Sequence, residues 1–449
     1  MKKSYIILIE GDNMYRYKFN ELKNWKNSKD RKPLIIRGAR QVGKTWLMQE
    51  FGKNEYEKCA YINFDSNIRM AELFSGDFDI ERIIQGLKIE SGVNIEPENT
   101  LIIFDEVQET PKALTSLKYF YEKANEYHIV AAGSLLGVAM HEGISFPVGK
   151  VDFLDLYPLN FLEFLRALGE NDLVELIEKN DIEMINIFAD KLKNYLKQYL
   201  YIGGMPEVVE TYISTKDFTE VRRKQEVLLE AYEQDFSKHA PNSVVPRIRQ
   251  LWNNIPTQLA KENKKFIYGL VKQGARAREY EIALSWLIDC GLVYQINRVN
   301  ACKVPLSAYQ DFNAFKLYIL DVGLLCAKAK LDAVSIIDRN EILVEFKGAL
   351  TEQYVLTEIK SNINSPIFYW SAEKGTAEID YLIQIGKDNI PIEVKSNENL
   401  QAKSLKNFIE KYGTQKNVRT SMSNYRKEEK LMNIPLYLIC NIEKILRNS

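Results

Sequence analysis

Histidine and cysteine are scarce in this chain of 449 residues, and the few that occur are not grouped. The three histidines are His128, His141 and His239, and no two of the five cysteines have C-x-x-C spacing. Zinc sites need such side chains at short, regular spacings, and small disulfide-linked domains need many cysteines. The sequence therefore predicts neither a zinc site nor a disulfide framework, and a reducing cytoplasm is the expected compartment.

The chain also lacks a long apolar run and an excess of either charge. The apolar stretch 5–9 resembles the start of a signal peptide, but Glu10 and Asp12 interrupt it. No segment has the roughly 20 apolar residues that cross a bilayer. The formal net charge of -1 excludes a uniformly basic nucleic-acid binder, so any such contact must use a local patch. We expect a soluble protein without a membrane segment.

What the sequence does contain is a complete phosphate loop of the pattern G-x-x-x-x-G-K-T. An apolar strand pattern at 33–36 precedes it and a helix pattern at 46–51 follows it, as the motif requires. Its glycines let successive backbone N–H groups turn toward phosphate at a helix N-terminus. The pattern predicts bound ATP and Mg²⁺, with Lys44 on the phosphates and Thr45 on the metal. The predicted nucleotide-binding residues are Gly38, Ala39, Arg40, Gln41, Val42, Gly43, Lys44, Thr45 and Trp46.

Further strands at 60–65, 101–106 and 128–132 predict a parallel sheet. The third strand is continuously apolar and ends in Asp105 and Glu106, which would lie beside the phosphates. Adjacent carboxylates point to opposite faces of a strand, so we predict Asp105 in the Mg²⁺ shell and Glu106 as the catalytic base. Ser134 follows the last strand and is either a sensor of the γ-phosphate or the N-cap of a helix over 135–138.

Four segments, 37–45, 104–106, 132–134 and 157–161, together resemble an AAA-type ATPase family. In that family the ATPase domain is followed by a conserved domain of unassigned function, and the resemblance extends from Met14 onward. The family often has Gly-Arg at the position of Gly149-Lys150, where the arginine could act in trans. Lysine lacks the planar guanidinium that such a role uses, and Arg40 is the other candidate.

Residues 161–240 have a mainly helical pattern. Within the predicted domain 241–335, residues 244–304 predict three helices and then a short β-hairpin, the order of a winged helix. Basic residues in this segment could contact DNA phosphates, but acidic residues on the third helix fit a major groove poorly. DNA binding and protein docking therefore both stay open. The basic residues are Arg247, Arg249, Lys261, Lys264, Lys265, Lys272, Arg276, Arg278 and Arg298.

The last quarter of the chain predicts two strands, 378–385 and 390–395, joined by a turn near Lys387 and Asp388. That turn would set Asp380 opposite Lys395 and diagonal to Glu393, which is close enough for one divalent ion to bridge both carboxylates. With Glu352 on a preceding helix, the arrangement resembles the PD-(D/E)xK nuclease superfamily. The resemblance implies catalytic roles for Glu352, Asp380, Glu393 and Lys395 and metal ligation by Asp380 and Glu393, although related folds also persist as inactive binding domains.

The predicted fold class is α/β: a parallel-sheet P-loop core, a helical and winged-helix region, and a restriction-endonuclease-like α/β domain. The predicted divisions are an N-terminal extension at 1–13, then 14–160, 161–240, 241–335 and 336–449. We expect an ATP-hydrolysing switch or motor that acts on DNA, with a candidate Mg²⁺-dependent nuclease domain. The alternative is a nucleotide-regulated protein-docking scaffold with an inactive nuclease-like domain. The sequence leaves oligomerisation open.

Overall fold

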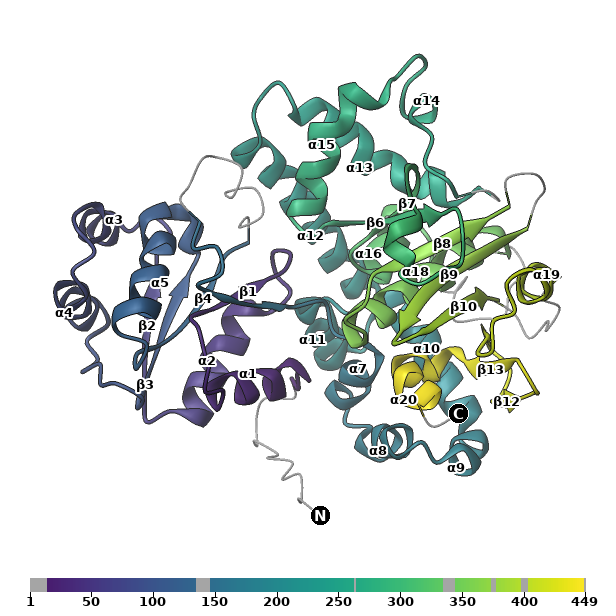
Figure 1. The fold of residues 1–449 in the computed structure, drawn as a ribbon, viewed down its shortest axis with the longest axis horizontal. Helices are drawn as coiled ribbons and strands as arrows, with labels where there is room; N and C mark the ends of the chain where they lie inside the picture. Colours follow the sequence, from purple (N-terminus) through teal and green to yellow (C-terminus); the bar gives the residue numbers. More distant parts are fainter. Residues whose placement is uncertain are drawn as a thin grey trace. The chain divides into compact units, whose positions relative to one another are not determined.

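The computed structural model describes residues 14–134, 146–261, 264–333, 344–372, 377–396 and 403–447. The chain forms two compact units, which Figure 1 shows as a ribbon. The N-terminal unit contains residues 16–158 and 285–292. The C-terminal unit contains residues 159–284 and 293–449, together with Met14 and Tyr15 among the described residues. The predicted extension at 1–13 lies outside the described residues.

A five-stranded, all-parallel sheet is the centre of the N-terminal unit, in the order β2-β3-β4-β1-β5. The four strands that the sequence predicted are present, and β5 is an addition that the sequence analysis missed. Because the strands are parallel, the carboxyl ends of β1, β3 and β4 meet at one edge. The strands are β1 (Leu34–Arg37), β2 (Lys58–Asn63), β3 (Thr100–Asp105), β4 (His128–Ala132) and β5 (Asp152–Asp155).

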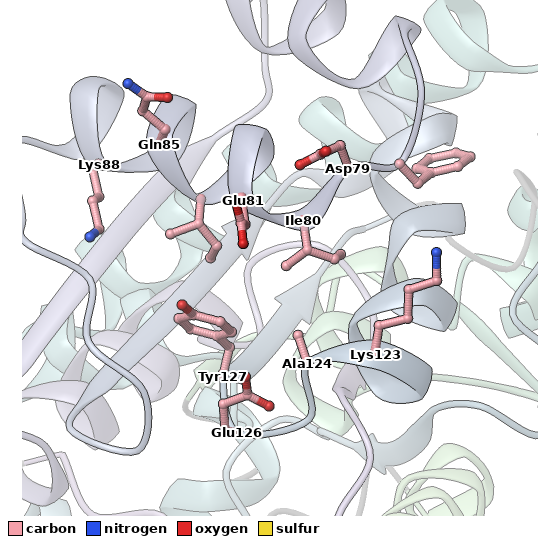
Figure 2. A pocket seen from close by; sticks show the side chains of 11 residues that line it. Asp79, Ile80, Glu81, Gln85, Lys88, Lys123, Ala124, Glu126 and Tyr127 are labelled. Atoms are coloured by element: carbon pink, nitrogen blue, oxygen red, sulfur yellow. The ribbon is translucent and has the colours of Figure 1, made fainter.

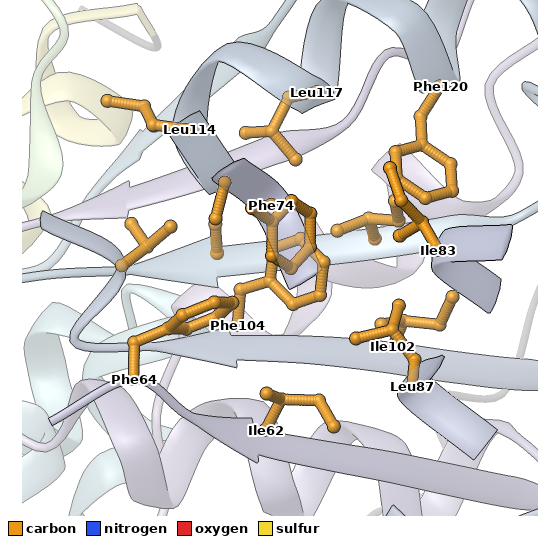
Figure 3. Close-up of a cluster of buried hydrophobic side chains, with 14 of the residues drawn as sticks. Ile62, Phe64, Phe74, Ile83, Leu87, Ile102, Phe104, Leu114, Leu117 and Phe120 are labelled. Carbon is orange, nitrogen blue, oxygen red and sulfur yellow. The ribbon is translucent and has the colours of Figure 1, made fainter. Parts of the chain in front are cut away.

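Helices cover both faces of this sheet. On one face α3, α4 and α5 bury an apolar cluster in which the ring of Phe104 on β3 lies 5.2 Å from Phe64 and 5.9 Å from Phe74 (Figure 3). On the other face α2 contacts β2, β3 and β4, and α1 packs on α2. This burial on both faces explains why β3 is apolar throughout. The helices are α1 (Lys18–Lys26), α2 (Lys44–Glu55), α3 (Ile68–Ser75), α4 (Ile80–Ser91), the short η1 (Val107–Glu109) and α5 (Pro111–Lys123).

The C-terminal unit begins with a helical region, as the sequence predicted. Apolar residues at three- and four-residue spacing bury one side of each long helix; α10, for example, buries Leu192, Leu196 and Tyr199. The helices are α7 (Phe161–Ala167), α8 (Asn171–Lys179), α9 (Ile182–Ile187), α10 (Ala189–Ile202), α11 (Pro206–Thr215), α12 (Phe218–His239), α13 (Val245–Leu259), α14 (Tyr268–Val271), α15 (Ala277–Asp289) and α16 (Val322–Lys328). The end of α15, from Ser285 onward, is counted with the N-terminal unit.

An eight-stranded mixed sheet follows, in the order β12-β13-β11-β10-β9-β8-β6-β7. Its strands are β6 (Val293–Val299), β7 (Gln310–Ile319), β8 (Ile367–Ser371), β9 (Glu378–Ile385), β10 (Asp388–Val394), β11 (Val418–Ser421), β12 (Arg426–Lys427) and β13 (Met432–Pro435). The remaining elements of this unit are η2 (Leu306–Tyr309), α18 (Val344–Asn362), α19 (Lys403–Tyr412), η4 (Leu436–Asn441) and α20 (Ile442–Arg447).

The predicted hairpin differs from the observed one. The sequence analysis placed a short hairpin before residue 304, but the partner of β6 is β7, which begins at Gln310. On its other side β6 pairs in parallel with β8, so the hairpin belongs to the large sheet. The parallel partner was not visible in the sequence because β8 lies about 70 residues further along the chain. The division of residues 161–449 into three domains stays a prediction.

No helix within the described ranges is long and apolar enough to cross a membrane.

Candidate functional site

The phosphate loop connects β1 to α2 at the carboxyl edge of the N-terminal sheet. Gly43 has φ 93°, and α2 begins at the next residue, Lys44. At Gly38 φ is 149°, and a Cβ would lie 2.2 Å from the backbone oxygen of Leu156. Gly38 and Gly43 therefore occupy backbone conformations that other residues rarely adopt, and Gly38 has no room for a side chain. The loop geometry that the motif predicts is present.

Lys44 is turned back onto the loop. Its Nζ donates to the carbonyl oxygens of Gly38 at 2.9 Å and Ala39 at 2.7 Å. Burial lowers the pKa of Lys44 to about 8, although Glu106 and Asp105 act in the opposite direction. An anion beside the loop would replace the two carbonyl acceptors and favour the charged ammonium.

Asp105, at the end of β3, accepts hydrogen bonds from two hydroxyl groups. Thr45 Oγ1 donates to its Oδ2 at 2.7 Å, and Tyr61 on β2 donates to the same oxygen at 2.8 Å. Thr45 and Asp105 thus place a hydroxyl and a carboxylate side by side, the oxygen ligands that Mg²⁺ prefers. These residues fit a bound Mg²⁺. The sequence analysis missed Tyr61, which the pairing of β2 with β3 brings beside Asp105.

Glu106 and Ser134 also meet at this edge. Ser134 Oγ donates to Glu106 Oε1 at 3.3 Å, and Gln108 Nε2 donates to Glu106 Oε2 at 2.7 Å. Glu106 has φ 50°, a left-handed conformation that costs a non-glycine residue about 1–3 kcal/mol and that is concentrated at functional sites. The predicted base and the predicted sensor are therefore neighbours. The helix for which Ser134 was the alternative N-cap lies outside the described residues.

Two further residues of the N-terminal unit support the loop, and sequence reasoning did not identify their contacts. Arg16 is buried, and its Nη1 donates to the backbone oxygen of Val42 at 3.0 Å. Gly291, which follows α15, has φ 72°, and a Cβ there would lie 3.1 Å from the backbone nitrogen of Ala39. The sequence analysis did not place Gly291 beside the loop.

The two arginine-finger candidates have different surroundings. Lys150 Nζ lies 3.0 Å from Glu122 Oε1, so its ammonium group already has an anionic partner within the unit. Arg40 is exposed on the loop. Trp46 is half-buried in the first turn of α2. No contact of Lys150 with the loop is present among the described contacts, and the arginine-finger role of either residue stays a prediction.

A pocket of about 610 Å³ lies in the same unit, beside the residue that precedes β4 (Figure 2). It is at the amino edge of the sheet, opposite the phosphate loop, because Tyr127 comes just before the first residue of β4. Both acidic and basic side chains line it, which selects no one class of ligand. The lining residues include Asp79, Ile80, Glu81, Lys88, Lys123 and Tyr127.

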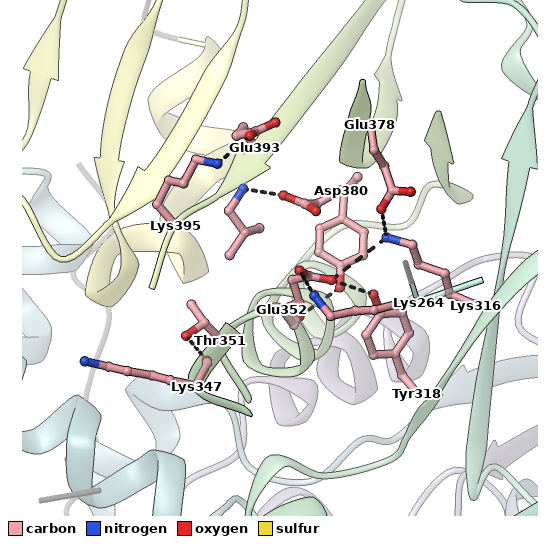
Figure 4. Close-up of polar contacts among 12 residues, drawn as sticks. Lys264, Lys316, Tyr318, Lys347, Thr351, Glu352, Glu378, Asp380, Glu393 and Lys395 are labelled. Atoms are coloured by element: carbon pink, nitrogen blue, oxygen red, sulfur yellow. Dashed lines mark hydrogen bonds and ion pairs between the residues drawn. The ribbon is translucent and has the colours of Figure 1, made fainter. Parts of the chain in front are cut away.

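The predicted nuclease-like residues gather in the C-terminal unit. Glu352 lies on α18, Asp380 on β9 and Glu393 on β10, with Lys395 directly after β10 (Figure 4). The predicted register was wrong by two residues. Ile385 pairs with Asp388 and Tyr381 with Ile392, so the next pair in line is Asp380 with Glu393, not Asp380 with Lys395.

The register error has a local cause. The turn consists of Gly386 and Lys387, and Gly386 has φ 60°, the left-handed conformation that two-residue hairpin turns require. Lys395 Nζ contacts Glu393 Oε1 at 2.7 Å, and Asp380 Oδ2 accepts the backbone N–H of Val394 at 2.7 Å. The three groups are neighbours, as predicted, but in a different register.

Two lysines that were not part of the predicted nuclease site contact its carboxylates. Lys264 donates to Glu352 Oε1. Lys316, on β7, has a fully buried side chain whose Nζ lies 2.5 Å from Glu378 Oε1 and 4.0 Å from Glu352 Oε2. Tyr318 donates to Glu352 Oε2 at 3.0 Å. We call Lys264, Lys316, Glu352 and Glu378 the lysine–carboxylate cluster.

The charges of this region shift the pKa values of its carboxylates in different directions. Burial alone would raise the pKa of Glu352, but Lys264 and Lys316 outweigh it and hold the pKa below its ordinary value. The pKa of Asp380 is well above its ordinary value because of burial and the nearby Glu352 and Glu393. Burial likewise raises the pKa of Glu393, against the effect of Lys395.

The arrangement does not fit the predicted Mg²⁺ ion. Within the part of the chain that the structure describes, no three His, Cys, Asp or Glu side chains are arranged to hold a metal ion. Glu352 is already bonded to Lys264 and Tyr318, and Glu393 Oε1 to Lys395. Metal ligation by Asp380 and Glu393 is therefore not supported by their observed surroundings.

The basic residues predicted as a DNA-contacting patch divide into three groups: paired, half-buried and exposed. Lys264 belongs to the lysine–carboxylate cluster, and Arg298 pairs with Asp311 at 2.6 Å. Because each already has a carboxylate partner, neither is counted among the residues that could contact DNA phosphates. Lys265 is half-buried. The others are exposed on or beside α13, α14 and α15: Arg247, Arg249, Lys261, Lys272, Arg276 and Arg278.

Three segments match known protein families. Residues 30–165 match a family described as an AAA domain, whereas residues 193–335 and 347–439 match two families described only as domains of unknown function (DUF8612 and DUF4143). The first match, with the phosphate-loop geometry, supports an AAA-type P-loop ATPase domain in the N-terminal unit. The other two matches assign no activity to the C-terminal unit.

Related proteins include two uncharacterised proteins of Methanocaldococcus jannaschii. MJ1544 is 25% identical over 368 residues, which are 78% of this chain and 71% of that protein. MJ1637 is 24% identical over 196 residues, or 40% of each chain. Similar solved structures include a Walker-type ATPase of Pyrococcus abyssi, which is 14% identical. The match covers 69% of this chain and 94% of that chain, with a TM-score of 0.43. The ORC1 protein of Aeropyrum pernix in complex with DNA has 11% identity, 71% and 94% coverage, and a TM-score of 0.28.

Proposed function

We propose that this protein binds ATP with Mg²⁺ in the phosphate loop and hydrolyses it. The supporting observation is the convergence at one sheet edge of Lys44, of the Thr45–Asp105 pair and of the Glu106–Ser134 pair. These are the groups that phosphoryl transfer requires: a phosphate cradle, metal ligands and a residue that orients water.

Each residue has a distinct role in this proposal. Lys44 leaves the carbonyl oxygens of Gly38 and Ala39 and binds the phosphates, while Thr45 and Asp105 hold Mg²⁺. The metal ion neutralises negative charge on the phosphates. Glu106 orients the attacking water and accepts its proton. Ser134, which donates to Glu106, holds that carboxylate and can sense the γ-phosphate.

Two substitutions test the ATPase proposal. Lys44→Ala should abolish ATP binding in calorimetry, whereas Glu106→Gln should keep ATP binding and lower kcat by about 100- to 1000-fold. Lys53→Ala and Glu109→Gln are matched controls, because both side chains are exposed on neighbouring helical segments. Equal ATP turnover by the wild type and Glu106→Gln would contradict the role given to Glu106.

We further propose that the nucleotide cycle controls binding to DNA in the cytoplasm. The exposed basic residues of α13 to α15 support backbone contacts with a duplex, which need positive charge but no base-specific groups. The double variant Arg276→Ala, Arg278→Ala should bind duplex, branched and single-stranded DNA more weakly. In a plot of the logarithm of the duplex binding constant against the logarithm of salt concentration, its slope should be less steep by about 1.8. Arg223→Ala, an exposed arginine of α12, is the control.

A second candidate is a nucleotide-regulated scaffold whose nuclease-like domain is inactive. The lysine–carboxylate cluster favours it, because ammonium groups already pair with Glu352, one of the predicted catalytic residues, and with the neighbouring Glu378. A nicking assay with ATP, Mg²⁺ and duplex DNA separates the candidates. Nicking by the wild type that disappears in Asp380→Ala and in Lys395→Ala would support a nuclease, and no nicking under any nucleotide condition supports the scaffold.

A further inference from the structure

The lysine–carboxylate cluster is assembled from four separate segments of the C-terminal unit. Lys264 lies between α13 and α14, Lys316 on β7, Glu352 on α18 and Glu378 on β9. Figure 4 shows the two lysine side chains approaching the carboxylates from the same side as Tyr318. Their positions depend on tertiary packing, since the paired residues are 62 and 88 positions apart in the sequence.

The cluster is too buried to be an ordinary surface ion pair. The side chain of Lys316 has no exposed area, and those of Lys264 and Glu352 are 13% and 8% exposed. Burying an ammonium group costs several kcal/mol unless anions and hydrogen bonds compensate for it. Each lysine meets this condition: Lys264 through Glu352, and Lys316 through Glu378 and Glu352.

The charge balance of this arrangement equals that of a metal site. A divalent cation carries two positive charges, and Lys264 and Lys316 together carry the same two. A metal ion beside Glu352 would have to displace Lys264 and lie close to the ammonium of Lys316, whose side chain is fully buried. Repulsion between the cations disfavours simultaneous occupancy.

We propose that the ammonium groups of Lys264 and Lys316 take the place of a divalent cation in the nuclease-like fold. The C-terminal unit is then complete without a metal ion, and Glu352, Glu378 and the two lysines hold α18 against β7 and β9. This inference goes beyond the proposed ATPase and does not depend on it.

One buried oxygen gives the proposal a gain-of-function test. Glu393 Oε2 has no hydrogen-bond partner among the described residues, and Glu393 lies next to Asp380 in the sheet. Removal of one competing ammonium would leave the neighbouring carboxylates of Glu352, Asp380 and Glu393 with a deficit of positive charge. Such a deficit attracts a divalent cation, although the three side chains are not arranged as a metal site in the described structure.

The experiment is a titration with Mn²⁺ alone, in calorimetry and in electron paramagnetic resonance of free Mn²⁺. The full chain carries Asp105→Asn, so that the phosphate loop contributes no metal site, and no nucleotide is added. With the lysines intact, we expect Mn²⁺ binding to be too weak to detect. In Lys316→Met or Lys264→Met, the affinity for Mn²⁺ should be at least about tenfold above that detection limit. Addition of Asp380→Asn should remove the gained affinity.

Lys264→Met is the second variant because its side chain is partly exposed and its loss disturbs the fold less than that of Lys316. The proposal would be overturned if the chain with both lysines intact binds Mn²⁺ tightly and Asp380→Asn abolishes that binding. This outcome does not depend on whether either lysine variant folds. A folded lysine variant that gains no affinity for Mn²⁺ would also overturn it.

Discussion

Asp105 in the N-terminal unit and Glu352 in the C-terminal unit are buried carboxylates with opposite kinds of partner. Asp105 accepts hydrogen bonds from the hydroxyl groups of Thr45 and Tyr61. Glu352 accepts from the ammonium of Lys264 and the hydroxyl of Tyr318, and Lys316 lies 4.0 Å away. Hydroxyl groups orient a carboxylate without cancelling its charge, whereas ammonium groups cancel it.

This difference indicates what each position can bind. A carboxylate held by hydroxyl groups still attracts a cation. In the N-terminal unit the ammonium of Lys44 donates to backbone carbonyl groups and not to Asp105. A carboxylate paired with buried lysines is already neutralised and attracts a further cation only weakly. Similar acidic motifs can therefore belong to a metal-dependent site in one unit and to a structural cluster in the other.

Glu358 adds a third case on the same helix as Glu352. Its carboxyl group is buried and accepts the backbone N–H of Phe161 at 2.8 Å. Burial raises the pKa of Glu358 to about 8, whereas the pKa of Glu352 lies below its ordinary value. Within one helix, the presence of lysine partners decides the direction of the shift.

The largest expected effect comes from breaking the cluster at its most buried member. Lys316→Met leaves Glu378 without its ammonium partner and Glu352 with Lys264 alone, which should lower the free energy of unfolding by about 3–5 kcal/mol. Urea denaturation measures this change. If charge compensation is the cause, Lys316→Met with Glu378→Gln should recover part of the loss; a double variant less stable than the single one would contradict this explanation.

A pH titration sharpens the contrast within α18. Since folding raises the pKa of Glu358 from its ordinary value of 4.5, the folded state favours the protonated acid, and stability falls as pH rises from about 4.5 to about 8. Between about pH 5 and pH 7 this loss amounts to up to about 3 kcal/mol.

Glu358→Gln removes this titration, so the stability difference between variant and wild type should grow across that pH range. Thermal unfolding at several pH values measures it. The same difference at pH 5 and pH 8 would show that Glu358 does not titrate in this range. Glu443→Gln, at a residue paired with Arg447 on the exposed side of α20, serves as the control.

A smaller effect tests the hydroxyl partners of Asp105. Tyr61→Phe removes one hydrogen bond, worth about 1 kcal/mol, and should raise the Mg²⁺ concentration needed for half-maximal ATP turnover about fivefold. ATP binding without Mg²⁺ should not change, because Tyr61 contacts the metal ligand and not the loop. A uniform loss of ATP affinity with and without Mg²⁺ would instead indicate a purely structural role.

The smallest effect is expected from the same lysine substitution at an exposed ion pair. Lys224 Nζ lies 2.6 Å from Glu207 Oε1, and these side chains are 27% and 49% exposed. Solvent screens such a pair, so Lys224→Met should change the free energy of unfolding by less than about 1 kcal/mol. A loss as large as that of Lys316→Met would show that burial is not what distinguishes the cluster.

Strand patterns in the first third of the chain were sufficient to predict the sheet edge that carries Asp105, Glu106 and Ser134. Buried parallel strands are continuous apolar runs, and their carboxyl ends necessarily share an edge. The hairpin of the last quarter was predicted as an element, but its register was not. A one-residue shift of the turn, from Lys387 and Asp388 to Gly386 and Lys387, moved the register by two residues and exchanged the neighbours of Asp380.

The sequence by itself determined the phosphate loop, because its backbone conformation depends on glycines and neighbours within eight consecutive residues. Only the tertiary structure decided which partners the C-terminal carboxylates have. Lys264, Lys316, Glu352 and Glu378 come from four elements, and the contacts of Glu352 depend on how α18 packs against the large sheet. A local motif specifies backbone geometry, whereas the charge state of a buried carboxylate depends on groups that folding brings from distant parts of the chain.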